Sequence, residues 1–178
     1  MNPKEIELIV LAQRDPRAFG PLYEMHFDAI FGFIRLRVPD APTAGDLTSQ
    51  TFLKAMSHIR KFEIRGIAFR SWLFRIALNE VNGWWRKQKK VKELSISSDQ
   101  LRSLVDKTEE YLEDDRLERL IIQLNDLPEA HLALMELRFF EGRSFKELSE
   151  ILGITENAAK MRVSRIVSTL RTAMGVEK

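Results

Sequence analysis

Residues 142–174 constrain the fold more than any other part of the chain, because they predict two helices joined by a tight corner. Ser144 can cap the first helix, and Glu147 stands three residues later, which is the spacing of a capping box. Gly153 suits the left-handed turn that ends such a helix, and Thr155 can cap the next one. We therefore expect a compact helix-turn-helix at the C-terminal end of the sequence.

The second helix of this pair separates into an apolar side and a polar side. The apolar positions at helical spacing are Ala159, Val163, Ile166, Leu170 and Met174. The other positions carry mostly cations and short polar groups: Asn157, Lys160, Met161, Arg162, Ser164, Arg165, Ser168 and Arg171. Cations can meet phosphates while short groups approach base edges, so this surface suits the major groove. An ordinary amphipathic helix with a solvated cationic edge gives the same pattern, and the compact turn before it favours DNA binding.

The rest of the chain also predicts helices, because β-branched alternation is missing and glycine and proline fall between periodic segments. The expected helices are 4–13, 16–37, 43–60, 70–90, 114–125, 129–140, 144–152 and 155–174. Pro39 and Pro42 are expected to break the chain between the second and third of them. The predicted fold class is therefore all-α.

Charge divides the chain into three blocks. Residues 1–92 hold 16 lysines and arginines against 9 acidic residues, residues 93–126 hold 4 against 10, and residues 127–178 hold 8 against 7. Together with a polar, weakly periodic stretch, this predicts two small helical domains, 1–92 and 114–178, joined by a flexible acidic linker at 93–113. The basic first block is expected to be drawn to a polyanion.

Composition argues against several classes of protein. There is no cysteine, which excludes a disulfide scaffold and a thiolate metal site and fits a reducing compartment. The sequence shows no signal peptide and no apolar stretch long enough to span a bilayer, so we expect a cytoplasmic protein without membrane insertion. His26, His58 and His131 are isolated, and no glycine-rich phosphate loop is present. We therefore expect no metal, no cofactor and no enzymatic activity.

A second informative stretch, residues 69–92, places tryptophans among cations. Bases of unpaired strands can stack on aromatic rings while cations hold the backbone, so the pattern is typical of single-strand binding. The alternative is a core helix whose tryptophans pack inward and whose tail is solvated. For Trp72 the apolar stripe around it favours the core, whereas residues 86–92 favour contact with a polyanion. The helix expected at 43–60 is, by itself, an ordinary amphipathic helix.

Three stretches in this order resemble the extracytoplasmic-function (ECF) group of bacterial sigma-70 family factors, the small two-domain initiation subunits of RNA polymerase. They are AGDLTSQTFLKAMSHIRKF, FRSWLFRIALNEVNGWWRKQKK and LPEAHLALMELRFFEGRSFKELSEILGITENAAKMRVSRIVSTLR. The resemblance implies a first domain that melts promoter DNA at the −10 element and a second that binds the −35 element. It also implies core RNA polymerase and promoter DNA as partners, leaves room for an anti-sigma factor, and agrees with a monomer in the free state.

The resemblance assigns roles to positions of this sequence. Polymerase docking falls to Asp46, Leu47, Gln50, Phe52 and Leu53. Contact with the unpaired −10 strand falls to Phe62, Arg65, Phe69, Arg70, Trp72, Arg75, Asn79, Trp84, Arg86 and Lys87. Contact with the −35 duplex falls to Thr155, Asn157, Lys160, Met161, Arg162, Ser164 and Arg165.

The chain departs from the family pattern at Ser49-Gln50, which lies among the docking positions, and at Gly83 and Trp84-Trp85, which lie among the −10 positions. These departures are expected to affect binding to the polymerase and to the −10 element. The competing hypothesis is a conventional helix-turn-helix regulator that binds a palindrome as a dimer without being a polymerase subunit. The basic, tryptophan-rich helix of the first domain speaks against that hypothesis, since a ligand pocket does not require it.

Overall fold

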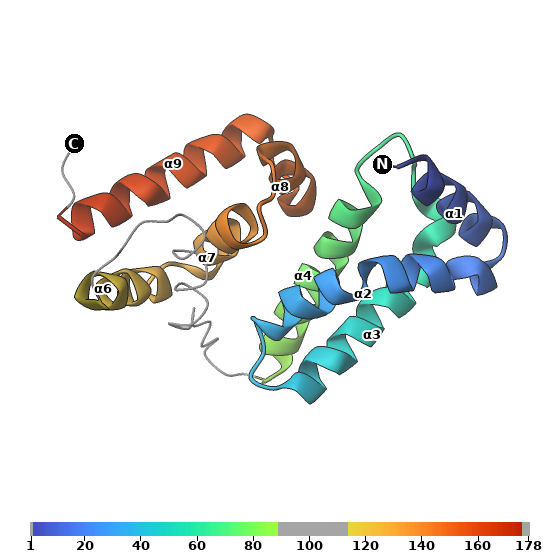
Figure 1. The fold of residues 1–178 in the computed structure, drawn as a ribbon, viewed down its shortest axis with the longest axis horizontal. Coiled ribbons are helices and arrows are strands. Elements are labelled where there is room, and N and C mark those ends of the chain that lie inside the picture. Colours follow the sequence, from blue (N-terminus) through green and yellow to red (C-terminus); the bar gives the residue numbers. More distant parts are fainter. Residues whose placement is uncertain (1, 89–113, 176–178) are drawn as a thin grey trace. The chain divides into compact units, whose positions relative to one another are not determined.

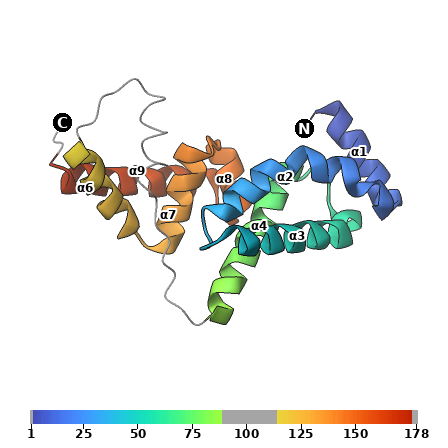
Figure 2. The ribbon, with the colours of Figure 1, turned by 60° about the horizontal axis from the view of Figure 1, so that its bottom comes forward.

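The computed structural model describes residues 2–88 and 114–175, which form two separate compact units (Figures 1 and 2). The predicted linker, residues 93–113, lies outside the described residues, as does the end of the tail at 89–92. The described residues contain helices and turns but no strand, which confirms the all-α prediction. No helix among them is long and apolar enough to cross a membrane.

The first unit is a bundle in which α2, α3 and α4 pack on one another and α1 covers one end. Its elements are α1 (Pro3–Arg14), the 3₁₀ turn η1 (Pro16–Phe19), α2 (Gly20–Arg35), α3 (Ala41–His58), the 3₁₀ turn η2 (Ile59–Lys61) and α4 (Phe69–Gln88). Figures 1 and 2 both show α2 and α3 side by side. Side chains cap two of the helices: Asn2 accepts from the backbone N–H of Lys4, and Asp40 accepts from that of Thr43.

Prolines explain two differences from the predicted helices. The helix expected at 16–37 divides into η1 and α2, because Pro21 has no N–H to continue the hydrogen bonding from η1 into α2. The prediction that Pro42 breaks the chain is wrong. Pro42 lies in the first turn of α3, where its missing N–H would have no helical partner in any case.

Large apolar side chains fill the core of the first unit. The buried ones include Ile9, Leu22, Ile30, Phe33, Ile34, Ile59, Phe69, Leu73 and Phe74. Phe33 and Phe74 join α2 to α4 in an edge-to-face contact with ring centroids 4.9 Å apart. The Gln13 amide donates to the carbonyl oxygens of Ile59 (3.1 Å) and Phe62 (2.7 Å), which ties α1 to the end of η2.

The second unit packs α9 against the other helices of its own unit. Its elements are α6 (Asp114–Asn125), α7 (Glu129–Met135), the π-helical turn η4 (Glu136–Phe140), α8 (Phe145–Leu152) and α9 (Glu156–Ala173). The helix expected at 129–140 therefore widens at its end, where Glu141 N–H donates to the Glu136 carbonyl at 3.0 Å. Leu132, Leu134, Leu137 and Leu148 lie in the core beneath α9.

Candidate nucleic-acid interface

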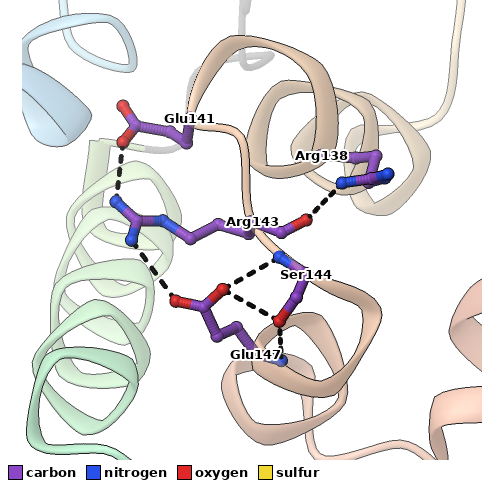
Figure 3. A network of polar contacts seen from close by, with 5 residues as sticks. All are labelled: Arg138, Glu141, Arg143, Ser144 and Glu147. Atoms are coloured by element: carbon purple, nitrogen blue, oxygen red, sulfur yellow. Dashed lines mark hydrogen bonds and ion pairs between the residues drawn. The ribbon is translucent and has the colours of Figure 1, made fainter. Parts of the chain in front are cut away.

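The capping box predicted for α8 is present (Figure 3). Ser144 Oγ accepts from the backbone N–H of Glu147 at 3.2 Å, and Glu147 Oε2 accepts from the backbone N–H of Ser144 at 2.9 Å. Burial on its own would raise the pKa of the Glu147 carboxyl. The hydrogen bonds from Ser144 and the charge of Arg143 outweigh burial and hold that pKa below its ordinary value.

A charged network braces the turn that leads into α8. Arg143 is buried and forms ion pairs with Glu141 at 3.1 Å and Glu147 at 3.5 Å (Figure 3). Arg138, on η4, donates to the Arg143 carbonyl at 2.9 Å. The network joins η4, the turn after it and the first turn of α8, so it fixes the direction in which α8 starts. Sequence patterns gave no sign of it, because nothing in the spacing of EGRS distinguishes a buried arginine from a solvated one.

The corner between α8 and α9 takes the predicted form. Gly153 adopts φ 66° and ψ 35°, a left-handed conformation that costs a residue with a Cβ more than it costs glycine. Ile154 N–H donates to the Ser149 carbonyl at 3.2 Å, which closes the end of α8. Thr155 Oγ1 then accepts from Ala158 N–H at 3.2 Å and caps α9. The helix-turn-helix geometry is thus set by one glycine and two capping side chains.

The two sides predicted for α9 are those that the structure has. Ala159, Val163, Ile166 and Leu170 are buried, and Met174 is half-buried just past the end of the helix. The residues predicted to contact the −35 duplex are all exposed: Thr155, Asn157, Lys160, Met161, Arg162, Ser164 and Arg165. Along its first three turns, α9 therefore presents a mostly polar and cationic surface that includes the apolar Met161.

The cations of this surface are not equivalent. Lys160 Nζ forms an ion pair with Glu156 at 2.9 Å and lies 5.9 Å from the centroid of the Phe145 ring. Arg138 lies 4.7 Å from the same ring centroid. Within residues 114–175, the guanidinium groups of Arg162 and Arg165 take part in no hydrogen bond or ion pair. These two arginines can therefore meet phosphates without breaking an existing contact.

In the first unit, a pocket of about 430 Å³ lies between the end of α3 with η2 and the middle of α4. Its lining residues are Lys54, His58, Lys61, Trp72, Arg75, Ile76, Asn79 and Glu80. Three of them, Trp72, Arg75 and Asn79, are predicted single-strand contacts. Sequence patterns missed the others, although Lys54, His58 and Lys61 recur at the i, i+4, i+7 spacing of one helix face.

The pocket combines an aromatic face, cations and hydrogen-bonding groups. Lys54 Nζ pairs with Glu80 Oε1 at 2.6 Å, and this links α3 to α4 at the pocket wall. Trp72 is half-buried and packs on Phe62 and Phe69, with ring centroids 5.0 and 5.6 Å away. The tryptophan thus belongs to both the core and the pocket, which joins the two alternatives raised by the sequence.

Phe62 and Phe69 cannot contact an unpaired strand directly, which corrects the prediction for these two residues. Phe62 is 7% exposed and Phe69 is fully buried, and their rings meet edge to face at 5.3 Å. Burying their apolar surface in the core is more favourable than leaving it in a solvated loop. Both rings pack against the ring of Trp72. Of the loop residues predicted to contact DNA, Arg65 is exposed.

The remaining predicted contacts of α4 follow its exposed side and its C-terminal end. Arg70, Asn79, Arg86 and Lys87 are exposed, whereas Arg75 is half-buried. Trp84 is half-buried and meets Trp85 edge to face at 4.7 Å. Trp85 Nε1 donates to the Arg37 carbonyl at 2.9 Å, so this second tryptophan anchors the end of α4 to the segment after α2.

The predicted polymerase-docking residues divide between surface and core. Asp46, Gln50 and Leu53 are exposed, and Leu53 keeps 59% of its surface open to solvent. Leu47 and Phe52 are buried, which corrects the prediction that they contact the polymerase directly. Their side chains instead hold α3 in the bundle. Leu53 directly follows the buried Phe52, and this one-residue step along the helix turns its side chain outward.

Metal binding has no support within residues 2–88 and 114–175, where no group of three or more His, Cys, Asp or Glu side chains could hold an ion.

Comparison with known proteins finds one family match in each of the two units. Residues 22–91 match the Sigma-70 region 2 family and residues 123–172 match Sigma-70, region 4. The ECF RNA polymerase sigma factor BldN of Streptomyces coelicolor is 33% identical over 175 residues, which cover 95% of this chain and 65% of that protein. RNA polymerase sigma factor YlaC of Bacillus subtilis is 30% identical over 135 residues, which cover 74% of this chain and 78% of the relative.

The fold is also shared with a solved structure. The sigma factor RpoE of Bartonella quintana, crystallised with the anti-sigma factor NepR, superposes with a TM-score of 0.60 at 23% identity, covering 90% of this chain and 98% of that one. Both family matches fall within the units that carry the pocket and the helix-turn-helix. The chain therefore belongs to the ECF group of the sigma-70 family.

Proposed function

We propose that this chain is a sigma factor that binds core RNA polymerase and directs promoter-specific initiation of transcription. Residues 114–178 hold duplex DNA at the −35 element, and residues 1–92 hold the unpaired strand at the −10 element. Residues 93–113 connect the two. The protein works in the cytoplasm, is a monomer when free, and has no catalytic residue of its own.

One observation carries the proposal: the two units expose surfaces of different chemistry. The exposed side of α9 offers free arginines and short polar groups on a helix that can enter the major groove. The α3–α4 pocket offers an aromatic face beside cations, which suits an unstacked base and its phosphate. A conventional helix-turn-helix regulator needs the first surface but not the second.

The energetics agree with strand capture rather than forced melting. Opening a base-pair step costs about 1.4 kcal/mol of stacking, and stacking of a base on protein returns about 1–3 kcal/mol. Trp72, with Arg75 and Asn79 beside it, is the group that we expect to receive such a base. The first domain then stabilises the open promoter once it forms.

Polymerase docking is assigned to the exposed side of α3. Asp46, Gln50 and Leu53 recur there at i, i+4 and i+7, which places them along one stripe. Leu53 is the apolar member of the stripe, and burying it against a partner removes its surface from water. An anti-sigma factor that covers this stripe would compete with the polymerase.

The test is reconstitution with purified core RNA polymerase and a library of promoter fragments. We expect run-off transcripts with defined start sites only when both proteins are present. A Leu53→Ser variant should lose polymerase binding while its melting temperature stays unchanged, and Leu11→Ser, also at an exposed leucine but on α1, serves as the control. Tight sequence-specific DNA binding by the free chain, or no start-site choice with the polymerase, would contradict the proposal.

A further inference from the structure

Met161 is an apolar side chain in the middle of the polar surface of α9. It keeps 48% of its surface exposed, and among the described residues of α9 no other large apolar side chain is open to this degree. Of the residues one turn away on either side, Asn157, Ser164 and Arg165 are exposed and the small Ala158 is half-buried. No large apolar neighbour one turn away along α9 therefore shields Met161 from water.

The position of Met161 along the helix places it where base edges are contacted. α9 begins at Glu156, so Met161 is in its second turn, about 7–8 Å from the start of the helix axis. Recognition helices contact bases mainly through their N-terminal residues, while flanking cations hold the phosphates. Arg162 and Arg165, whose guanidinium groups make no hydrogen bond or ion pair within residues 114–175, stand on the same helix within one turn of Met161.

The major groove offers one apolar group on its base edges, the C5-methyl of thymine. A methionine side chain has three rotatable bonds and a polarisable sulfur, so it can adapt to a methyl group whose position is fixed by the duplex. It cannot donate a strong hydrogen bond, so on a base without that methyl group it would leave the polar edge unpaired and gain no apolar contact in return.

We propose that Met161 selects a thymine in the −35 duplex by packing on its C5-methyl group. This inference rests on the proposed function, since it requires α9 to enter the major groove. It adds a specificity-determining residue whose ligand is a single methyl group, whereas the arginines beside it contact phosphates irrespective of sequence.

The experiment replaces thymine by uracil, which removes the methyl group and nothing else. The −35 sequence is first obtained by selecting random duplexes with the complete chain bound to core polymerase. Each thymine on either strand of the selected element is then changed to uracil, one at a time. We expect one position at which uracil weakens binding about fivefold, the size of one buried methyl contact.

Variants assign that effect to the side chain. Met161→Ala should weaken binding to the thymine duplex by the same factor and should be indifferent to uracil at that position. Ser168→Ala, two turns further along the same surface, is the matched control and should keep the uracil effect. Since Met161 is exposed, its replacement should leave the melting temperature unchanged, and this is measured alongside.

Three outcomes would overturn the inference. The uracil effect could persist in Met161→Ala, or the selected element could hold no thymine, or Met161→Ala could weaken binding to core polymerase without DNA, which would make the side chain a protein contact. Failure of the proposed function looks different, because the polymerase complex would then select no −35 sequence at all.

Discussion

Arg165 is exposed and unpaired within its unit, so its contribution to DNA binding can be separated from its contribution to folding. Arg165→Gln should weaken binding of the polymerase complex to all −35 sequences alike. The slope of log K against log salt should become shallower by about one, since one phosphate contact is lost. Lys146→Gln, which removes an exposed cation from α8, is the control. An unchanged salt slope in Arg165→Gln would remove this arginine from the interface.

Lys160 illustrates the opposite case. Its ammonium group already pairs with Glu156, and both side chains are about half exposed, so the pair adds little to stability. Glu156→Gln should release Lys160 and remove a negative charge from the DNA-facing surface. We expect tighter binding of the −35 duplex at low salt, by a few-fold, with a difference that shrinks as salt rises. Electrophoretic shift titrations at two salt concentrations measure it, and weaker binding would contradict it.

The buried pair of His26 and Glu5 makes the stability of the first unit depend on pH. His26 Nε2 lies 3.0 Å from Glu5 Oε1 and joins α2 to α1. Burial lowers the pKa of His26, and the charge of Arg70 adds to this, although Glu5 opposes it. In the unfolded chain the pKa of His26 returns to about 6.5, so the unfolded state takes up a proton at higher pH than the folded state. The contribution of neutral His26 is therefore complete above pH 6.5 and is lost as pH falls below it.

Tryptophan fluorescence can follow the unfolding of the first unit at each pH, because all three tryptophans, Trp72, Trp84 and Trp85, belong to this unit. We expect the fluorescence melting temperature to fall between pH 7.5 and pH 5. His26→Gln should flatten that dependence, whereas His58→Gln, at an exposed histidine, should keep it. Hydrogen bonds from Arg17 and Thr43 lower the pKa values of Asp15 and Asp40. These two carboxyl groups therefore change charge below pH 5, outside the range of the experiment. A wild-type melting temperature that does not change from pH 7.5 to pH 5 would contradict the assignment.

At the scale of elements, glycines in α4 and after α8 should respond to alanine in opposite directions. Gly83 lies inside α4, and a Cβ there meets no atom within 4 Å, so Gly83→Ala should stabilise the first unit by about 0.5–1 kcal/mol. Gly153 also has open space, but its φ of 66° is unfavourable for alanine. Gly153→Ala should destabilise the second unit by about 1 kcal/mol. Fluorescence melting follows the first variant and circular dichroism the second, and equal signs would refute the argument.

The same elements show what could be predicted from the sequence. Helix positions followed from local rules: the Ser144–Glu147 box and Gly153 mark the two ends of α8, and Thr155 marks the start of α9. These features depend on neighbours within four residues, which is the range that sequence patterns describe well.

Features that depend on distant contacts were missed. Phe62 and Phe69 lie between the helices expected at 43–60 and 70–90, yet both are buried: Phe62 packs on Trp72 of α4, and Phe69 packs on Phe19 of η1 and His26 of α2. The pairing of Glu5 with His26 spans 21 positions, and the pocket needs α3 and α4 together. Burial of this kind is decided by packing between elements, which helical periodicity within one element does not determine.

At the scale of the whole molecule, each unit holds its own core, so each should fold when produced alone as residues 1–92 or 114–178. Connection then matters for function rather than for folding. Two weak sites on one chain bind together with an effective concentration set by the connecting segment, which can exceed the concentration of free pieces by orders of magnitude.

Mixed in trans at micromolar concentration, the two pieces, residues 1–92 and 114–178, should retain their separate helical spectra and melting transitions. They should support at most a small fraction of the start-site-specific transcription given by the intact chain with core polymerase. Raising the concentration of the second piece should recover part of the activity, because occupancy then replaces connection. If the first piece alone gave full start-site choice, the −35 contact would be dispensable and the assignment of α9 would have to be abandoned.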